Sequence, residues 1–86
     1  MEAEKMFNEL GWKKLNSDKS DITYLKESNS NGFLLSDYIV FEKESKWLDM
    51  YTIESIGNYD RRVNLTLDDF KVIDAVRKQG EELGWI

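Results

Sequence analysis

Residues 33–54 read FLLSDYIVFEKESKWLDMYTIE and have the composition of two β-strands joined by a polar turn. Both apolar parts are rich in β-branched and aromatic residues, which favour strands. The polar residues 42–45 between them are typical of the turn of an antiparallel hairpin. We therefore predict one strand from Phe33 to Glu42 and a second strand from Lys46 to Glu54.

Weaker patterns on either side predict further strands. Residues 22–26 are β-branched and aromatic, and Asn31-Gly32 suits a tight turn with positive φ at both positions, leading into the hairpin. Residues 63–65 predict at most a brief edge strand. We expect residues 16–21, 27–32 and 57–62 to be loops or turns.

Helices are predicted at both ends of the chain. Residues 2–10 place apolar side chains at helical spacing, and Gly11-Trp12 is typical of a Schellman ending in which Trp12 packs over Phe7. Residues 82–85 repeat the Glu-Leu-Gly-Trp sequence of residues 9–12, so a second helix is expected to end in the same way.

For this second helix we predict Thr66 as N-cap, with Asp69 as its capping-box partner and Asp68 also in the first turn. A glycine within the helix, Gly80, indicates a close approach to the sheet. The face expected to be buried comprises Phe70, Ile73, Val76, Gly80 and Leu83.

These elements predict an α+β fold of α-β-β-β-α order. We expect a two-layer sandwich with an antiparallel sheet of three or four strands, a short N-terminal helix and a long C-terminal helix. Because the chain has only 86 residues, we expect residues 1–86 to form a single domain.

The composition excludes several kinds of chemistry. The chain contains no histidine, cysteine or proline, so no disulfide, thiolate or imidazole metal site, or His-dependent catalytic site can form. We expect a protein that is not an enzyme and needs no cofactor or metal. The net charge of −5 argues against direct binding to nucleic acid. No membrane-length apolar run and no signal peptide are visible, so we expect a cytoplasmic protein without a membrane partner.

The predicted hairpin is apolar on both faces. A two-layer sandwich needs only one apolar sheet face, so the other could bind a partner protein or form a homodimer. Alternatively, one helix covers each face, or bulges mix the two sets of residues. Residues 31–60 contain six acidic and two basic side chains, which could imitate a nucleic-acid backbone or simply be solvated. The side chains that we predict to bind a partner are Asp37, Glu42, Trp47, Asp49, Tyr51, Glu54, Tyr59 and Arg61.

The two Glu-Leu-Gly-Trp motifs, with Met6-Phe7 before the first and the Ile39-Val40-Phe41 strand between them, resemble short proteins encoded in phages and prophages of Gram-positive bacteria. The resemblance implies a small accessory protein in the host cytoplasm that binds and modulates or inhibits a host protein, such as an anti-defence or anti-CRISPR factor. The target could itself be a nucleic-acid-binding protein. The alternative function is a structural homodimeric module without a regulatory target.

Overall fold

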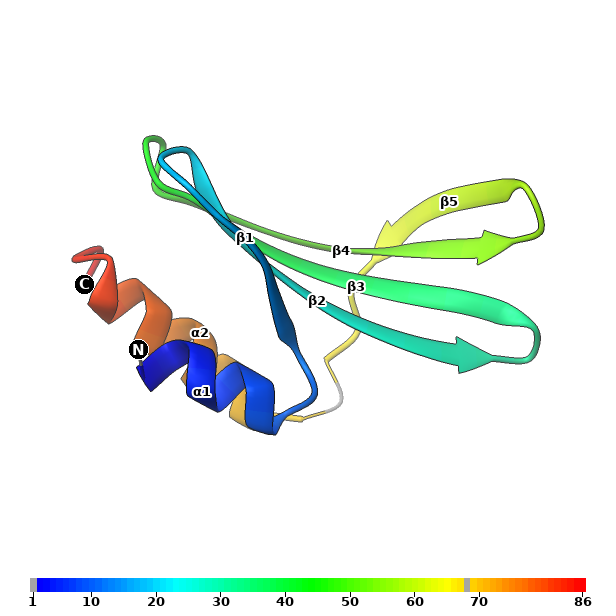
Figure 1. The fold of residues 1–86 in the computed structure, drawn as a ribbon, viewed down its shortest axis with the longest axis horizontal. Helices are drawn as coiled ribbons and strands as arrows, with labels where there is room; N and C mark the ends of the chain where they lie inside the picture. Colours follow the sequence, from blue (N-terminus) through cyan, green and yellow to red (C-terminus); the bar gives the residue numbers. More distant parts are fainter. Residues whose placement is uncertain (1, 68) are drawn as a thin grey trace.

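The computed structural model describes residues 2–67 and 69–86 and shows a helix, an antiparallel sheet and a second helix (Figure 1). The strands follow one another in the sheet in the order β1-β2-β3-β4-β5, and each pairs antiparallel to the next. The elements are α1 (Glu2–Glu9), β1 (Lys13–Ser17), β2 (Asp21–Ser30), β3 (Phe33–Glu42), β4 (Trp47–Ile56), β5 (Tyr59–Asn64) and α2 (Lys71–Glu82).

The α+β class, the short N-terminal helix and the C-terminal helix are confirmed, but the predicted number of strands is wrong. The sheet has five strands instead of three or four because β1 and β5 lie in segments that we expected to be mainly loops. The composition of β1, KKLNS, gives little strand signal, and this strand is held by pairing with β2 across an irregularity between Lys14 and Asn16. The charged β5 begins directly after the tight turn at Gly57.

The central hairpin has the predicted form. Strand β3 has the predicted bounds, and β4 is shifted slightly towards the C-terminus.

The turn between β2 and β3 also has the predicted conformation. Asn31 and Gly32 have φ values of 51° and 84°, as expected for a two-residue turn with positive φ at both positions. Strand β2 extends to Ser30, so the turn is shorter than the predicted residues 27–32.

Both helices lie side by side on the same face of the sheet (Figure 1). They end as predicted: the N–H of Trp12 donates to the carbonyl of Phe7 at 2.9 Å, and that of Trp85 donates to the carbonyl of Gly80 at 2.9 Å. The intervening Gly84 has a φ of 75°, which a side chain would disfavour.

The start and the buried face of α2 differ from the prediction. The helix begins at Lys71, and the Asp69 carboxylate accepts a hydrogen bond from the Lys71 N–H at 2.9 Å, so Thr66 is not the N-cap. Asp68 lies outside the described residues. The side chain of Phe70 is 87% exposed and that of Ile73 is 49% exposed. The buried residues of α2 are Val72, Ala75, Gln79 and Gly80, of which Gly80 was predicted. Val76 and Leu83 are partly buried against the core, as expected.

The reason for the different face is a hydrogen bond that periodicity does not reveal. The Tyr24 hydroxyl donates to Oε1 of Gln79 at 2.6 Å, which allows a polar side chain to lie in the buried stripe. Our expectation that Gly80 approaches the sheet is also wrong. A Cβ atom on Gly80 would meet the side chain of Ile86 at 3.8 Å instead.

The core lies between the two helices and the adjoining half of the sheet. Its centre is aromatic: the rings of Phe7 and Tyr24 stack with centroids 3.9 Å apart, and Phe41 packs edge-on against both. Burial, and then the negative charges of Glu4 and Glu82, raise the pKa of Tyr24 above its ordinary range, so its hydroxyl stays protonated and donates. The other half of the sheet, with the β2–β3 and β4–β5 turns, extends beyond both helices (Figure 1).

Candidate partner-binding surface

One face of the sheet is uncovered by any helix of the described chain, because α1 and α2 share the opposite face. The alternative that one helix covers each face is therefore wrong. The register between β3 and β4 runs without interruption from Leu34 opposite Ser55 to Glu42 opposite Trp47, so bulges do not mix the two faces either. No helix of the described chain therefore covers Tyr38, Val40, Tyr51 and Ile53, which are half-buried on this face. We call this surface the open face.

Four side chains from three strands form the centre of the open face. Tyr38 and Tyr51 are directly opposite one another on β3 and β4, and their rings stack with centroids 5.1 Å apart and an angle of 20°. The Arg62 guanidinium of β5 lies 4.1 Å from the centroid of the Tyr51 ring. The same guanidinium forms an ion pair with Asp49, with Nη2 3.2 Å from Oδ1. We name Tyr38, Asp49, Tyr51 and Arg62 the open-face cluster.

The open-face cluster holds its side chains in place before any partner binds. Stacking and the cation–π contact restrict both tyrosine rings, so less rotamer freedom is lost on binding. Burial is the main cause that raises the pKa of Tyr51, and the neighbouring Tyr38 adds to it, while Arg62 acts in the opposite direction. The Tyr51 hydroxyl therefore stays protonated at neutral pH and can donate a hydrogen bond to a partner.

The border of the open face is predominantly acidic. Strand alternation in the observed register places two basic side chains, Lys13 and Arg62, on this face, and Arg62 is already paired with Asp49. Trp47, 68% exposed, stands at one end of the same face. The acidic side chains on the face are Asp21, Glu27, Glu42, Asp49 and Asp60.

The sheet separates the eight predicted binding residues into two groups. Strand alternation places four of them on the open face and four on the face that carries the helices. The open-face group is Glu42, Trp47, Asp49 and Tyr51, and the group on the helix side is Asp37, Glu54, Tyr59 and Arg61. Tyr38 and Arg62 were not among the predicted residues. The predicted strand bounds, with Glu42 and Lys46 beside the turn, would pair Tyr38 with Met50, whereas the observed register pairs it with Tyr51.

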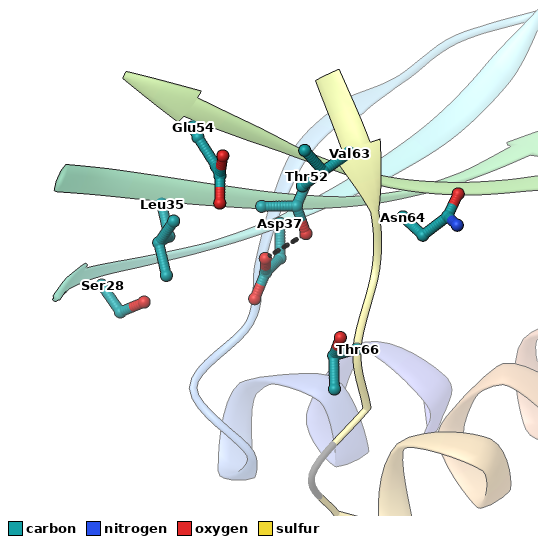
Figure 2. A pocket seen from close by; sticks show the side chains of 8 residues that line it. All are labelled: Ser28, Leu35, Asp37, Thr52, Glu54, Val63, Asn64 and Thr66. Carbon is teal, nitrogen blue, oxygen red and sulfur yellow. Dashed lines mark hydrogen bonds between the residues drawn. The ribbon is translucent and has the colours of Figure 1, made fainter. Parts of the chain in front are cut away.

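Asp37 and Glu54 of the helix-side group line a cleft of about 290 Å³ between the sheet and the segment that leads into α2 (Figure 2). Asp37 accepts a hydrogen bond from the Thr52 hydroxyl at 2.6 Å, and Arg61 pairs with Glu54 at 2.6 Å. The hydrogen bond to Glu54 is the main cause that raises the pKa of Arg61. Both carboxylates thus have partners within the chain.

The described residues contain no group of three or more acidic side chains that could hold a metal ion, and none of their helices is long and apolar enough to cross a membrane. No protein-family model, curated protein or solved structure matches the chain. The function proposed below therefore depends on the chain's own residues.

Proposed function

We propose that this protein is a non-enzymatic binding protein that covers a basic surface of a partner protein with its open face. The observation that carries the proposal is the open-face cluster, in which aromatic rings, a guanidinium and a carboxylate are prearranged on an uncovered sheet. Tyr, Trp and Arg are the residues that contribute most often to the energetic centres of protein interfaces. This surface contains all three residue types, and Trp47 is its most exposed aromatic side chain.

The acidic border supports a partner of opposite charge. Carboxylates around an aromatic centre favour encounter with Arg- and Lys-rich surfaces and raise the association rate. They repel the phosphates of nucleic acid, so a nucleic-acid-binding protein fits this surface better than a nucleic acid does. Two copies of the same face would bring acidic borders together, which makes a homodimer through the open face the weaker alternative.

The resemblance to phage-encoded proteins supports the choice of a bacterial host protein as the partner. We accordingly propose that the protein acts in the host cytoplasm and inhibits its target by covering the basic site that the target uses for nucleic acid. Anti-defence activity would be one such case. The open face supplies the contact, and inhibition follows from steric exclusion of the nucleic acid.

The experiment that tests this function is affinity capture from the lysate of a Gram-positive host, with the wild type beside a Trp47→Ala/Tyr51→Ala variant. The matched control is Phe70→Ala, which removes an aromatic side chain that is 87% exposed and lies outside the open face. We expect the wild type and the control to recover a partner protein from nuclease-treated lysate, and the double variant to lose it.

Two further measurements sharpen the result. Because attraction between exposed charges is screened by salt, recovery should fall between about 0.05 and 0.5 M NaCl. Light scattering after size exclusion should show a monomer that becomes a complex only with the partner. Equal recovery by all three proteins would refute the proposal, and so would a dimer that the Trp47→Ala/Tyr51→Ala variant converts to a monomer.

A further inference from the structure

An apolar groove lies on the helix side of the sheet, remote from the open face. The two helices do not extend across β4, so Leu48 remains 44% exposed and Met50 36% exposed. The groove has a volume of about 300 Å³ and runs between the start of β4, one side of α2 and the C-terminal residues. Its apolar lining includes Leu48, Ile73, Val76, Gly80, Trp85 and Ile86.

The walls of the groove are fixed by contacts already described. Trp85 packs against the core residue Phe41, with ring centroids 5.9 Å apart, and its position follows from the helix ending at Gly84. Gly80 contributes no side chain, which leaves space beside Ile86. Ile73 is 49% exposed and was predicted to be core. Ile73 thus contributes to one wall of this groove instead of to the core.

The charged side chains of the groove are basic, whereas the protein as a whole has a negative net charge. Among the described residues that line it, the charged ones are Lys46 and Arg77. The Arg77 Nε lies 3.8 Å from a Glu81 oxygen, and its side chain is 75% exposed, so the guanidinium is open to a second carboxylate. A chain of net charge −5 therefore has an apolar groove with a basic border.

The spacing of the wall residues indicates the shape of the occupant. Ile73, Val76, Arg77 and Gly80 follow one another at the i, i+3, i+4 and i+7 positions of α2, the pattern along which a second helix packs. An additional helix in the groove would extend the helical layer across β4 and cover Leu48. A strand would leave this ridge of side chains without matching contacts.

We infer that this groove binds an amphipathic helical segment of a partner protein that has acidic residues beside its apolar stripe. Bulky apolar side chains of that segment pack against Leu48, Ile73 and Trp85, and its carboxylates pair with Lys46 and Arg77. Helix-in-groove binding of this kind is a common mode of peptide recognition. The groove is a second binding site, independent of the open face and of opposite charge.

Two-dimensional ¹H–¹⁵N NMR of the ¹⁵N-labelled protein with synthetic peptides tests the inference. The first peptide is a 16-residue helix former with leucines at i, i+3, i+4 and i+7 and glutamates on both flanks. The second has lysines in place of the glutamates, and the third keeps the glutamates but has serines in place of the leucines. We expect the first peptide alone to bind at up to about 1 mM, with the largest shifts at Lys46, Leu48 and residues 73–80 and 84–86.

Charge reversal separates the proposed docking from non-specific apolar binding. Lys46→Glu/Arg77→Glu should weaken binding of the first peptide about tenfold or more, as expected when two rim charge pairs change from attraction to repulsion, and should allow the second peptide to bind. The matched control Lys5→Glu/Lys13→Glu makes the same change in net charge at exposed positions away from the groove. This control and the Trp47→Ala/Tyr51→Ala variant should bind the first peptide like the wild type.

The substituted side chains lie at the surface, and the spectrum of each free variant shows directly that it is folded. The inference is overturned if the first peptide causes no shifts at about 1 mM, if the first two peptides bind equally, or if the shifts centre on Tyr38, Tyr51 and Arg62 of the open face. It is also overturned if the control charge reversal weakens binding as much as the groove reversal does.

Discussion

The hydrogen bond between Tyr24 and Gln79 joins the sheet to α2 inside the core, and it allows a sharp test of how the helical layer is held. The Tyr24 side chain is fully buried and Gln79 is 5% exposed, with 2.6 Å between the hydroxyl and Oε1. Tyr24→Phe leaves the Gln79 oxygen buried without its donor. Such a loss costs about 1–3 kcal/mol, and we expect about 2 kcal/mol here because water cannot replace the hydroxyl.

The companion variants turn this cost into a double-mutant cycle. Gln79→Leu keeps an apolar side chain of similar length but leaves the Tyr24 hydroxyl without its acceptor, again at about 2 kcal/mol. Tyr24→Phe/Gln79→Leu removes both polar groups together and should cost less than about 1 kcal/mol. The coupling free energy is then about 3 kcal/mol in favour of the pair, well above the scatter of additive mutations.

Urea denaturation at pH 7, followed by tryptophan fluorescence and circular dichroism, measures these free energies of unfolding. For a domain of this size, a loss of 2 kcal/mol corresponds to a decrease in Tm of roughly 8–16 °C. Tyr51→Phe is the matched control, since its half-buried ring on the open face should allow a change below about 0.5 kcal/mol. Additive costs in the double variant would refute the reasoning that the hydrogen bond permits Gln79 to be buried.

Three other predictions follow from the helix endings and from titrating groups. Gly84→Ala should lower the free energy of unfolding by about 1 kcal/mol because φ is 75° at this position. Gly80→Ala should raise it by about 0.5–1 kcal/mol because alanine favours a helix more than glycine does. Thermal unfolding measures both changes, and equal effects of the two substitutions would contradict the prediction. Hydrogen bonds from Ser20, Asp21 and Asn16 hold the pKa of Asp18 below its usual range, so its stabilising effect is complete above pH about 4 and is lost on acidification. Wild type should therefore exceed Asp18→Asn in Tm at pH 7, and the gap should shrink below pH 4; a gap that stays constant would contradict this. Because the pKa of Tyr24 is raised, its contribution is present below pH about 10 and is lost above it, so Tyr24→Phe should lose stability less steeply than wild type between pH 10 and 12.

The parts of the fold that could be predicted are those encoded by neighbouring residues. The hairpin of residues 33–54, the Asn31-Gly32 turn and both glycine-tryptophan helix endings depend on local backbone preferences, and all are present. Strand β5 was predicted only as a brief edge strand at residues 63–65, because Asp60, Arg61 and Arg62 have weak strand preference. Pairing with β4, together with ion pairs from Arg61 to Glu54 and from Arg62 to Asp49, compensates for this weakness.

The buried face of α2 and the division of the binding residues needed three-dimensional information. Two apolar stripes overlap on α2, and the burial of Val72, Ala75 and Gln79 shows which of them is inside. The surplus of apolar residues on the hairpin was visible in the sequence, but periodicity could not tell whether a helix would cover them. Asp37 and Glu54 were grouped with Trp47 because the residues were selected by charge and aromatic character, whereas alternation along β4 places Glu54 and Trp47 on opposite faces.

The extension of the sheet beyond the helical layer has a consequence for how the molecule opens. Backbone amides near Ile22, Tyr24 and Ile39 are shielded by the aromatic core, so their hydrogen exchange should require global unfolding. The β2–β3 and β4–β5 turns have no such cover and should exchange through local fraying of the strand ends (Figure 1). The open-face cluster lies across the boundary between these two regions. A partner that binds there would contact both regions and reduce the fraying of the strand ends. Hydrogen exchange at the β2–β3 and β4–β5 turns would then become slower, although the partner does not touch these turns.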